Sequence, residues 1–204
     1  LGYPDGEAIS FEELFFVVKR IVQAVKIPVS VDFESGYAED PTVVAAYVKQ
    51  LADIGVVGIN LEDGQVQDGK RILGDSKLLV DKIKAIKKVT SIFINARADT
   101  YTTKHPQALA ESIKRAHAYQ EAGADGIFIP LIESKEDIKS FVEQVTLPLN
   151  VFSTPKLPAY ADLATLGVKR ISHGAKQYDL LMKKSEQLFQ DFQKSKDYAI
   201  VLGS

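Results

Sequence analysis

The segment IGVVGI at residues 54–59 joins the end of a predicted helix to the start of an apolar strand through a single glycine, Gly55. The same kind of junction returns as AGADGI at residues 122–127 and as LGVKRI at residues 166–171. Glycine ends helices readily because it adopts the left-handed backbone conformation that follows the last helical turn. A helix–glycine–strand unit that repeats along the chain predicts parallel strands joined by helical crossovers.

Six short runs rich in β-branched residues are predicted as strands, and helical patterns fill the intervals between them. The six runs are Ile27–Phe33, Val56–Leu61, Ser91–Ala96, Gly126–Ile129, Leu147–Phe152 and Val168–Ser172. Helix starts are signalled by a capping box of Ser10 and Glu13, and by Asp40 directly before Pro41. Because the runs are continuously apolar, they are typical of parallel strands that are buried on both faces.

The α/β pattern fits an open doubly wound sheet or an eight-stranded (β/α)8 TIM-type barrel. No Gly-x-Gly-x-x-Gly motif follows a predicted strand, and polar residues end several successive strands, so the barrel is favoured. We expect residues 1–204 to form one domain. The barrel needs eight strands, and the helix predicted over Ser10–Val25 has no strand before it. We therefore expect two strands and one helix to precede Leu1.

The composition predicts a globular protein with a sizeable core, with 46% hydrophobic residues, 25% charged residues and a formal net charge of −2. Nucleic acids and anionic membranes bind basic surfaces, so neither is an expected partner. No apolar run reaches the ~20 residues needed to cross a bilayer. The absence of cysteine excludes disulfides, thiolate metal ligands and a cysteine nucleophile. We expect a cytoplasmic protein.

Polar side chains gather at the carboxyl ends of three successive strands, where a barrel carries its catalytic groups. Side chains alternate along a strand, so residues two apart share a face. The residues that share a face at these ends are Asp32 with Glu34, Asn60 with Glu62, and Arg97 with Asn95 and Asp99. Crowded carboxylates repel one another unless they share a cation, and oxygen ligands suit Mg²⁺ or Mn²⁺. An arginine beside them can hold a substrate carboxylate.

The same acids also have a structural interpretation, as N-caps of the helices that follow or as surface ion-pair partners. That interpretation suits Asp63 and Asp99, because loops before helices favour aspartate. It suits Asp32 and Glu34 poorly, because one cap is enough for a loop and Asp40 already supplies it. We therefore predict functional roles for Asp32, Glu34, Glu62 and Arg97.

Four motifs, read in order along the chain, resemble the isocitrate lyase/phosphoenolpyruvate mutase superfamily. They are GYPD at residues 2–5, VDFESGY at 31–37, GINLED at 58–63 and NAR at 95–97. The resemblance runs the full length of the chain. It implies a Mg²⁺-dependent enzyme that makes or breaks a C–C or P–C bond beside a 2-oxo or 2-hydroxy acid, through an enolate of pyruvate or a related species.

The resemblance also implies roles for individual residues. Asp32 is expected to bind the metal directly, and Glu34 and Glu62 are expected to act through metal-bound water. Arg97 is the expected substrate clamp, and Asp5 matches an active-site acid. The resemblance thus implies catalytic roles for Asp5, Glu62 and Arg97, and substrate binding by Tyr3, Asn60, Asn95 and Arg97.

The chain departs from the isocitrate-cleaving members after the motif that ends in Asp63. Their Lys-Lys-Cys-Gly-His gating loop is replaced by GQVQDGKR at residues 64–71, which has neither cysteine nor histidine. The Lys/Asn/Thr-Ser element of phosphonate mutases and hydrolases is absent from the same stretch. Leu131 follows Pro130 where lyases for tricarboxylates tend to carry Pro-Glu. These departures favour a smaller substrate, such as oxaloacetate or a simple 2-oxo acid.

We therefore predict a Mg²⁺-dependent lyase that cleaves the C–C bond next to the carbonyl of a small 2-oxo or 2-hydroxy carboxylic acid. Two alternatives stay open. One is a P–C bond mutase or hydrolase acting on phosphonopyruvate. The other is a barrel that binds 2-oxo acids without turnover.

The last predicted helix, Gln177–Lys194, carries an apolar stripe. The stripe could pack on the protein's own barrel. Members of the resembling family instead exchange such a helix between subunits, so the terminal helix and tail over residues 175–204 are expected to support a homodimer or homotetramer.

Overall fold

The computed structural model describes residues 2–3, 6–67 and 69–203 and divides the chain into two compact units, Leu1–Ile171 and Ser172–Ser204. The first unit is built on a six-stranded sheet with the strand order β1-β2-β5-β6-β7-β8. Its strands are β1 (Val29–Asp32), β2 (Val56–Glu62), β5 (Phe93–Arg97), β6 (Gly126–Ile129), β7 (Leu149–Phe152) and β8 (Arg170–Ser172). Neighbouring strands from β1 through β7 are parallel.

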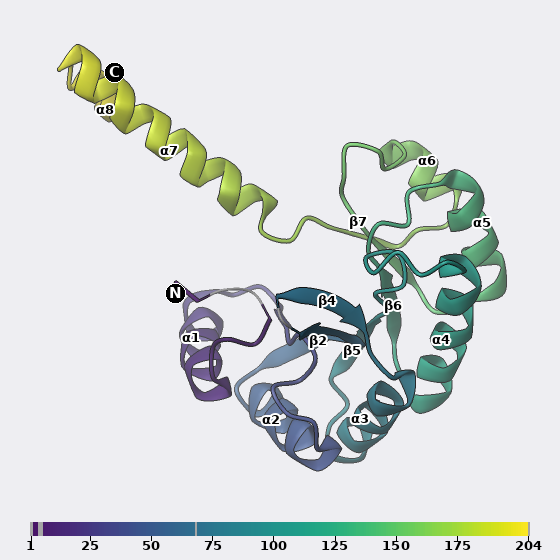
Figure 1. The fold of residues 1–204 in the computed structure, drawn as a ribbon. Helices are drawn as coiled ribbons and strands as arrows, with labels where there is room; N and C mark the ends of the chain where they lie inside the picture. The colour runs from purple at the N-terminus through teal and green to yellow at the C-terminus, as the bar shows by residue number, and fades with distance from the viewer. Residues whose placement is uncertain (1, 4–5, 68, 204) are drawn as a thin grey trace. The chain divides into compact units, whose positions relative to one another are not determined.

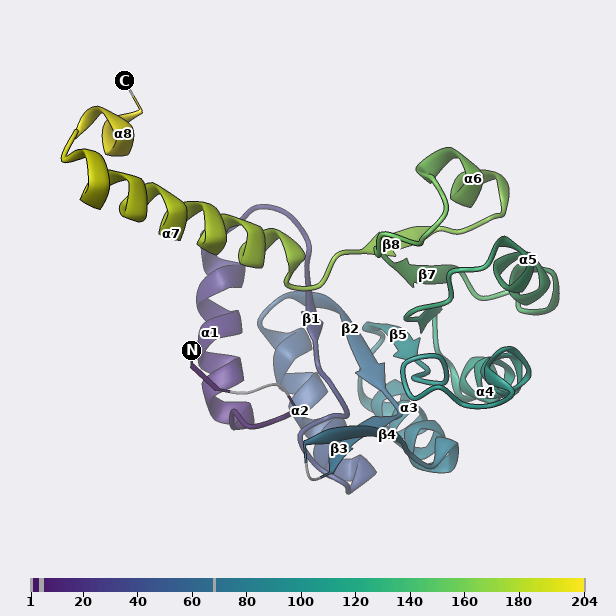
Figure 2. The ribbon, with the colours of Figure 1, turned by 45° about the horizontal axis from the view of Figure 1, so that its top comes forward.

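The sheet curves like half of a barrel, and the helices of the first unit lie along its outer side (Figures 1 and 2). The helices are α1 (Phe11–Ala24), α2 (Pro41–Asp53), α3 (Ser76–Val89), α4 (Ala108–Ala122), α5 (Lys135–Gln144) and α6 (Tyr160–Thr165). The structure therefore confirms an α/β fold with a parallel sheet.

All six predicted strands are present, and their observed bounds differ from the predicted ones by at most two residues at either end, as at Ile27 against Val29. The predicted helix starts are confirmed too. The Ser10 hydroxyl accepts from the N–H of Glu13 over 3.2 Å, and Glu13 accepts from the N–H of Ser10 in return. Asp40 accepts from the N–H of Thr42 over 2.7 Å. Caps of this kind stabilise a helix by about 1 kcal/mol each.

The three glycine junctions adopt the backbone conformation that the sequence predicted. Gly55, Gly123 and Gly167 have φ angles of 102°, 107° and 92°. A residue with a Cβ atom rarely adopts such angles, so these glycines let each helix turn directly into the next strand.

An antiparallel hairpin of β3 (Gly64–Gln67) and β4 (Lys70–Leu73) is the main feature that the sequence did not predict. The sequence predicts no strand in residues 64–71, which take the place of a loop in the resembling family. Each strand has four residues, too few for an alternating pattern to stand out from a polar loop. The hairpin starts two residues after Glu62 and lies beside the carboxyl end of β2 (Figure 2).

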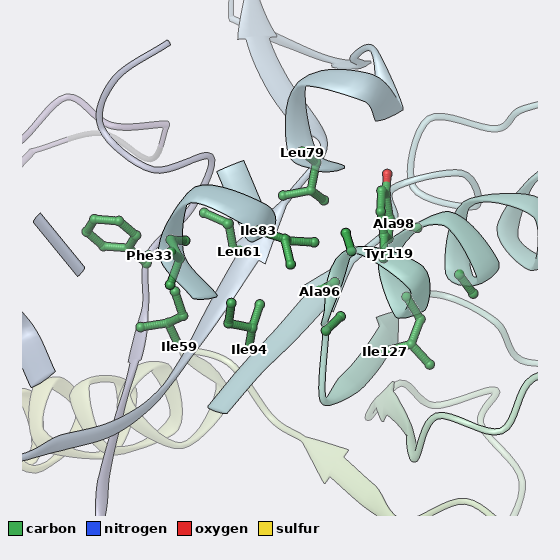
Figure 3. Packing of buried hydrophobic residues seen from close by; sticks show 14 of the residues in the cluster. Phe33, Ile59, Leu61, Leu79, Ile83, Ile94, Ala96, Ala98, Tyr119 and Ile127 are labelled. Carbon is green, nitrogen blue, oxygen red and sulfur yellow. The ribbon is translucent and has the colours of Figure 1, made fainter. Parts of the chain in front are cut away.

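The buried core lies between the sheet and the helices (Figure 3). Ile59 and Leu61 of β2 point into it and are 1% and 0% exposed, and Ile83 of α3 packs there as well. Burying one such side chain stabilises the fold by roughly 1.5–3 kcal/mol. Because side chains alternate along a strand, Asn60 and Glu62 point to the opposite, inner face of the curved sheet.

The second unit holds α7 (Lys176–Ser195) and α8 (Ala199–Leu202). The side chains of the predicted apolar stripe of α7 are solvent-exposed: Leu180 is 53% exposed, Leu181 64% and Phe189 55%. In the described part of the chain, no helix is both long enough and apolar enough to cross a membrane.

Candidate functional site

A first row of polar side chains crosses the inner face of β1, β2 and β5. Asp32 lies opposite Asn60, and Asn60 lies opposite Asn95. The Asn95 amide donates to Oδ1 of Asn60 over 2.8 Å. Arg170, the first residue of β8, also reaches Oδ1 of Asn60, over 3.4 Å. The row therefore brings together three residues that the sequence predicted at the ends of separate strands.

A second row lies one step nearer to the carboxyl ends of the strands. The N–H of Glu62 donates to the carbonyl oxygen of Glu34 over 2.7 Å, so the two acids are neighbours through their backbones. Glu62 lies opposite Arg97 in the parallel register, and Nη1 of Arg97 contacts Oε2 of Glu62 over 2.7 Å. The Arg97 guanidinium also lies 5.6 Å from the ring centre of Phe128. The second row therefore places two carboxylates and one guanidinium side by side.

Glu62 is held by two arginines rather than one. Arg71 of the β3–β4 hairpin binds its Oε1 atom, while Arg97 binds Oε2. Burial raises the pKa of the Glu62 carboxyl to about 7, although the charge of Arg97 acts in the opposite direction. The sequence does not indicate Arg71 as a site residue, because nothing in a polar stretch of eight residues shows which side chain a hairpin turns inward.

The loop after β1 is held in an unusual backbone conformation. Glu34, Tyr37 and, in the preceding segment, Glu7 have φ angles of 44°, 59° and 60°. The N–H of Glu7 donates to Oε2 of Glu34 over 2.8 Å, and the Tyr37 hydroxyl donates to Oε1 over 3.3 Å. Glu7 in turn accepts from the Ser35 hydroxyl and the N–H of Tyr37, over 2.8 Å and 3.0 Å. Non-glycine residues with a positive φ angle store strain of order 1–3 kcal/mol each, and such residues cluster at functional sites.

A cavity of about 370 Å³ opens beside this loop and the hairpin. It is lined by Glu34 and Glu62, by the loop and hairpin residues around them, and by Lys82 of α3. Lys82 is 3% exposed, and its ammonium donates to the carbonyl oxygen of Ser35 over 2.6 Å. Burial lowers the pKa of Lys82. The ammonium therefore anchors the loop that carries Glu34.

Asp63 takes part in a buried ion pair, a third arrangement beside the cap and the surface ion pair that the sequence suggested. Its Oδ2 atom accepts from Nη1 of Arg115 over 2.9 Å and from the Tyr119 hydroxyl over 2.5 Å. Its Oδ1 atom accepts from the N–H of Asp99 over 2.9 Å. These contacts connect the end of β2 to α4 and to the segment after β5. Asp63 therefore helps to fix the position of the neighbouring Glu62.

The carboxylates fit a hydrated cation better than a dry one. Among residues 2–3, 6–67 and 69–203, no three His, Asp or Glu side chains form a group that could hold a metal. Glu34 and Glu62 nevertheless line one cavity, which has room for water. Asp32 ends β1 two residues before Glu34 and is not among the residues that line this cavity. Mg²⁺ usually keeps several waters, so this donor set fits it through water, and the ligand roles stay predictions.

Of the predicted site residues, Glu34 and Glu62 line the cavity, whereas Asp32, Asn60, Asn95 and Arg97 lie on β1, β2 and β5 and are not among its lining residues. Two further predicted residues, Asp5 and Tyr3, are not placed at the cavity by the described structure. Asp5 lies outside the described residues. The Tyr3 hydroxyl donates to Oε1 of Glu13 on α1 over 2.6 Å, and the residue is 49% exposed. Their proposed roles in catalysis and substrate binding therefore rest on the resemblance.

The family model for phosphoenolpyruvate phosphomutase matches residues 1–193 of the chain. The chain belongs to this family. Membership confirms the resemblance drawn from the four sequence motifs, which lie within the matched range.

Two relatives match 71% or more of this family member. An uncharacterised protein of Mycobacterium tuberculosis is 35% identical over 178 residues, which cover 87% of this chain and 66% of that protein. The 2,3-dimethylmalate lyase of Eubacterium barkeri is 35% identical over 154 residues, which cover 71% of this chain and 52% of the lyase. The chain thus spans between about half and two thirds of these relatives.

Solved structures of the phosphoenolpyruvate phosphomutase family share the fold. A Burkholderia cenocepacia protein provisionally named a phosphonomutase has a TM-score of 0.86 and 36% identity. The match covers 93% of this chain and 79% of that one. The relatives named as enzymes include lyases and a decarboxylase.

Proposed function

We propose that the protein is a Mg²⁺-dependent lyase that cleaves the C–C bond next to the carbonyl of a small 2-oxo or 2-hydroxy carboxylic acid. The observation that carries the proposal is the second row, where Glu34 and Glu62 adjoin each other and Arg97 contacts Glu62 over 2.7 Å. Glu34 and Glu62 of this row line the cavity of about 370 Å³, a size that suits a small ligand.

The side chains of the site have separate proposed roles. Asp32, Glu34 and Glu62 are the residues that would hold Mg²⁺. When bound, Mg²⁺ stabilises the negative charge that develops on the carbonyl oxygen of the substrate as the neighbouring bond breaks. Arg97 has N–H groups beyond those that bind Glu62 and Asp99, and these grip the substrate carboxylate. Asp5 would donate the proton that the substrate carbon takes up after its C–C bond has broken.

The first test is the release of pyruvate from oxaloacetate and related 2-oxo acids, with and without EDTA. We expect EDTA to abolish the reaction and added Mg²⁺ to restore it. Equal rates with and without EDTA would reject the metal role. No product from any acid, together with thermal stabilisation by oxalate and Mg²⁺, would indicate a binding protein without turnover.

A matched pair of variants makes the test specific for the site. Glu34→Gln removes a predicted ligand, whereas Glu39→Gln removes the same charge from an exposed residue that lines the same cavity. We expect Glu34→Gln to lose the stabilisation by Mg²⁺ and oxalate, and Glu39→Gln to keep it. Equal loss of this stabilisation in both variants would mean that the effect comes from the lost negative charge at the cavity and not from a lost metal ligand.

Cleavage or rearrangement of a P–C bond in phosphonopyruvate is the second candidate. It is favoured by the family match and by the likeness to the protein that is provisionally named a phosphonomutase. Release of inorganic phosphate from phosphonopyruvate, or its conversion to phosphoenolpyruvate, at a higher kcat/KM than oxaloacetate would select this candidate over the C–C lyase.

The architecture of the intact site is also a proposal. We propose that the curved sheet is part of a closed (β/α)8 barrel. Phe93 shares the inner face with Asn95 and Arg97 and is 44% exposed, and a closed barrel would cover it. We further propose a cytoplasmic homodimer or homotetramer assembled through α7, whose exposed apolar side chains support this. Sedimentation of a variant with Leu181 and Phe189 replaced by serine tests the assembly.

A further inference from the structure

The β3–β4 hairpin brings a second guanidinium to the acids that Arg97 already holds. Arg71 lies on β4 opposite Val66 of β3, and its Nη1 atom contacts both the Glu62 carboxylate and Oδ2 of Asp99, the latter over 2.9 Å. The Arg71 side chain is 19% exposed, and the side chains of Glu62 and Asp99 are 4% and 0% exposed. These contacts are therefore largely removed from water, where ion pairs are screened least.

The two arginines and two acids form a closed ring of contacts. Arg97 binds Oε2 of Glu62 over 2.7 Å and, through Nε and Nη2, Oδ1 of Asp99 over 2.9 Å and 2.8 Å. Arg71 binds the other oxygen of each acid. The ring contains two positive and two negative charges, and each carboxylate is fixed at both oxygens.

Glu62 and Arg97 lie on the central sheet and Asp99 follows two residues after β5, whereas Arg71 lies on the β3–β4 hairpin. Glu62 and Arg97 are paired in the parallel register, and the N–H of Asp99 is fixed by Asp63 over 2.9 Å. Arg71 comes from the separate two-stranded sheet. Because a hairpin of two strands has little stability of its own, the position of Arg71 and the position of the hairpin depend on each other.

We infer that Arg71 is a positioning residue of the site, which holds Glu62 against the hairpin and competes with a divalent cation for its Oε1 atom. The inference rests on the proposed function, since it assigns Glu62 to the metal. Arg71 keeps the ring neutral when no cation is bound. A cation that binds at Glu62 must therefore displace the positive charge of Arg71.

Replacement of Arg71 therefore has opposite effects on cations and anions. Without its charge the ring is net negative, so Arg71→Gln should bind Mg²⁺ roughly fivefold more tightly and oxalate plus Mg²⁺ roughly fivefold more weakly. Arg71→Lys keeps the charge but not the fork that spans two carboxylates, so its Mg²⁺ affinity should stay near that of the wild type while kcat falls.

Isothermal titration with Mg²⁺ alone, then with oxalate, measures both affinities without turnover. Lys70→Gln, at the exposed neighbouring position of β4, removes the same charge and is the matched control. It should leave both affinities unchanged. Wild-type Mg²⁺ affinity in Arg71→Gln, or the same tightening in Lys70→Gln, would overturn the inference.

Hydrogen exchange of residues 64–73 in metal-free protein gives a second, independent reading. We expect Arg71→Gln to exchange faster over the hairpin than the wild type and Lys70→Gln, with the central sheet unchanged. If the wild type binds no Mg²⁺, the proposed function fails. In that case the hydrogen exchange still tests the inference about Arg71 by itself. Equal exchange over the hairpin in Arg71→Gln and the wild type would overturn that inference.

Discussion

Gly64 and Asp99 lie so close together that the glycine has no room for a side chain. A Cβ atom on Gly64 would overlap Oδ2 of Asp99 and lie 2.8 Å from Nη1 of Arg71. The first residue of the hairpin is therefore a glycine because the ion-pair ring passes directly over its backbone.

Gly64→Ala should destabilise the fold by roughly 2–4 kcal/mol, because the buried Asp99 and Arg71 side chains must both move. Gly69→Ala in the hairpin turn is the control. Its Cβ meets nothing within 4 Å, but its φ of 70° costs about 1 kcal/mol for alanine. Urea denaturation of both variants measures the difference, and equal losses would show that the close approach at Gly64 has no energetic effect.

Arg97→Lys should lower kcat/KM by roughly 100-fold, because a lysine cannot bind Glu62 and Asp99 and still offer paired donors to a substrate carboxylate. Arg20→Lys on α1, where the guanidinium lies 4.4 Å from the ring centre of Phe16, is a surface control for the same substitution. Steady-state kinetics with the best 2-oxo acid compares them. A loss of less than tenfold in Arg97→Lys would remove Arg97 from the role of substrate clamp.

Tyr119→Phe should cost about 1–2 kcal/mol of stability, because the Tyr119 hydroxyl donates to Asp63 over 2.5 Å and both groups are buried. Tyr178 is 65% exposed, so Tyr178→Phe should change the stability by less than about 0.5 kcal/mol. Thermal unfolding of the two variants tests this. Identical midpoints would mean that Asp63 finds a replacement donor.

The stability of metal-free protein should depend on pH through Glu62. Burial raises the pKa of this carboxyl from its ordinary value of 4.5 to about 7, with Arg97 opposing. Between these two values the folded state binds more protons than the unfolded state, so the free energy of unfolding falls as pH rises through this window. Below the window the contribution of Glu62 is fully present.

Glu62→Gln lacks this titration. We therefore expect the stability of the wild type relative to Glu62→Gln to decrease from pH 4.5 to 7 and to stay constant above that window. Urea denaturation in the presence of EDTA, repeated across the pH range, measures the difference. A difference that stays flat, or that grows with pH, would contradict a raised pKa at Glu62.

The sequence by itself determined the α/β class, the parallel strands and the strand ends that carry the polar residues. These features are local: a glycine such as Gly123 ends a helix, and alternation along β2 separates Leu61 from Glu62. The four motifs were enough to indicate the family, which the match over residues 1–193 confirmed.

Only the tertiary structure decided which charges meet. Arg71 on the hairpin and Asp99 in the segment after β5 are 28 residues apart in the chain and in contact. Lys82 of α3 donates to the carbonyl oxygen of Ser35, which is 47 residues away in the chain. No local pattern encodes such pairs, because the direction of a polar side chain in a short hairpin or on a helix flank depends on what packs against it. Burial in that packed setting also sets the ionisation of Glu62.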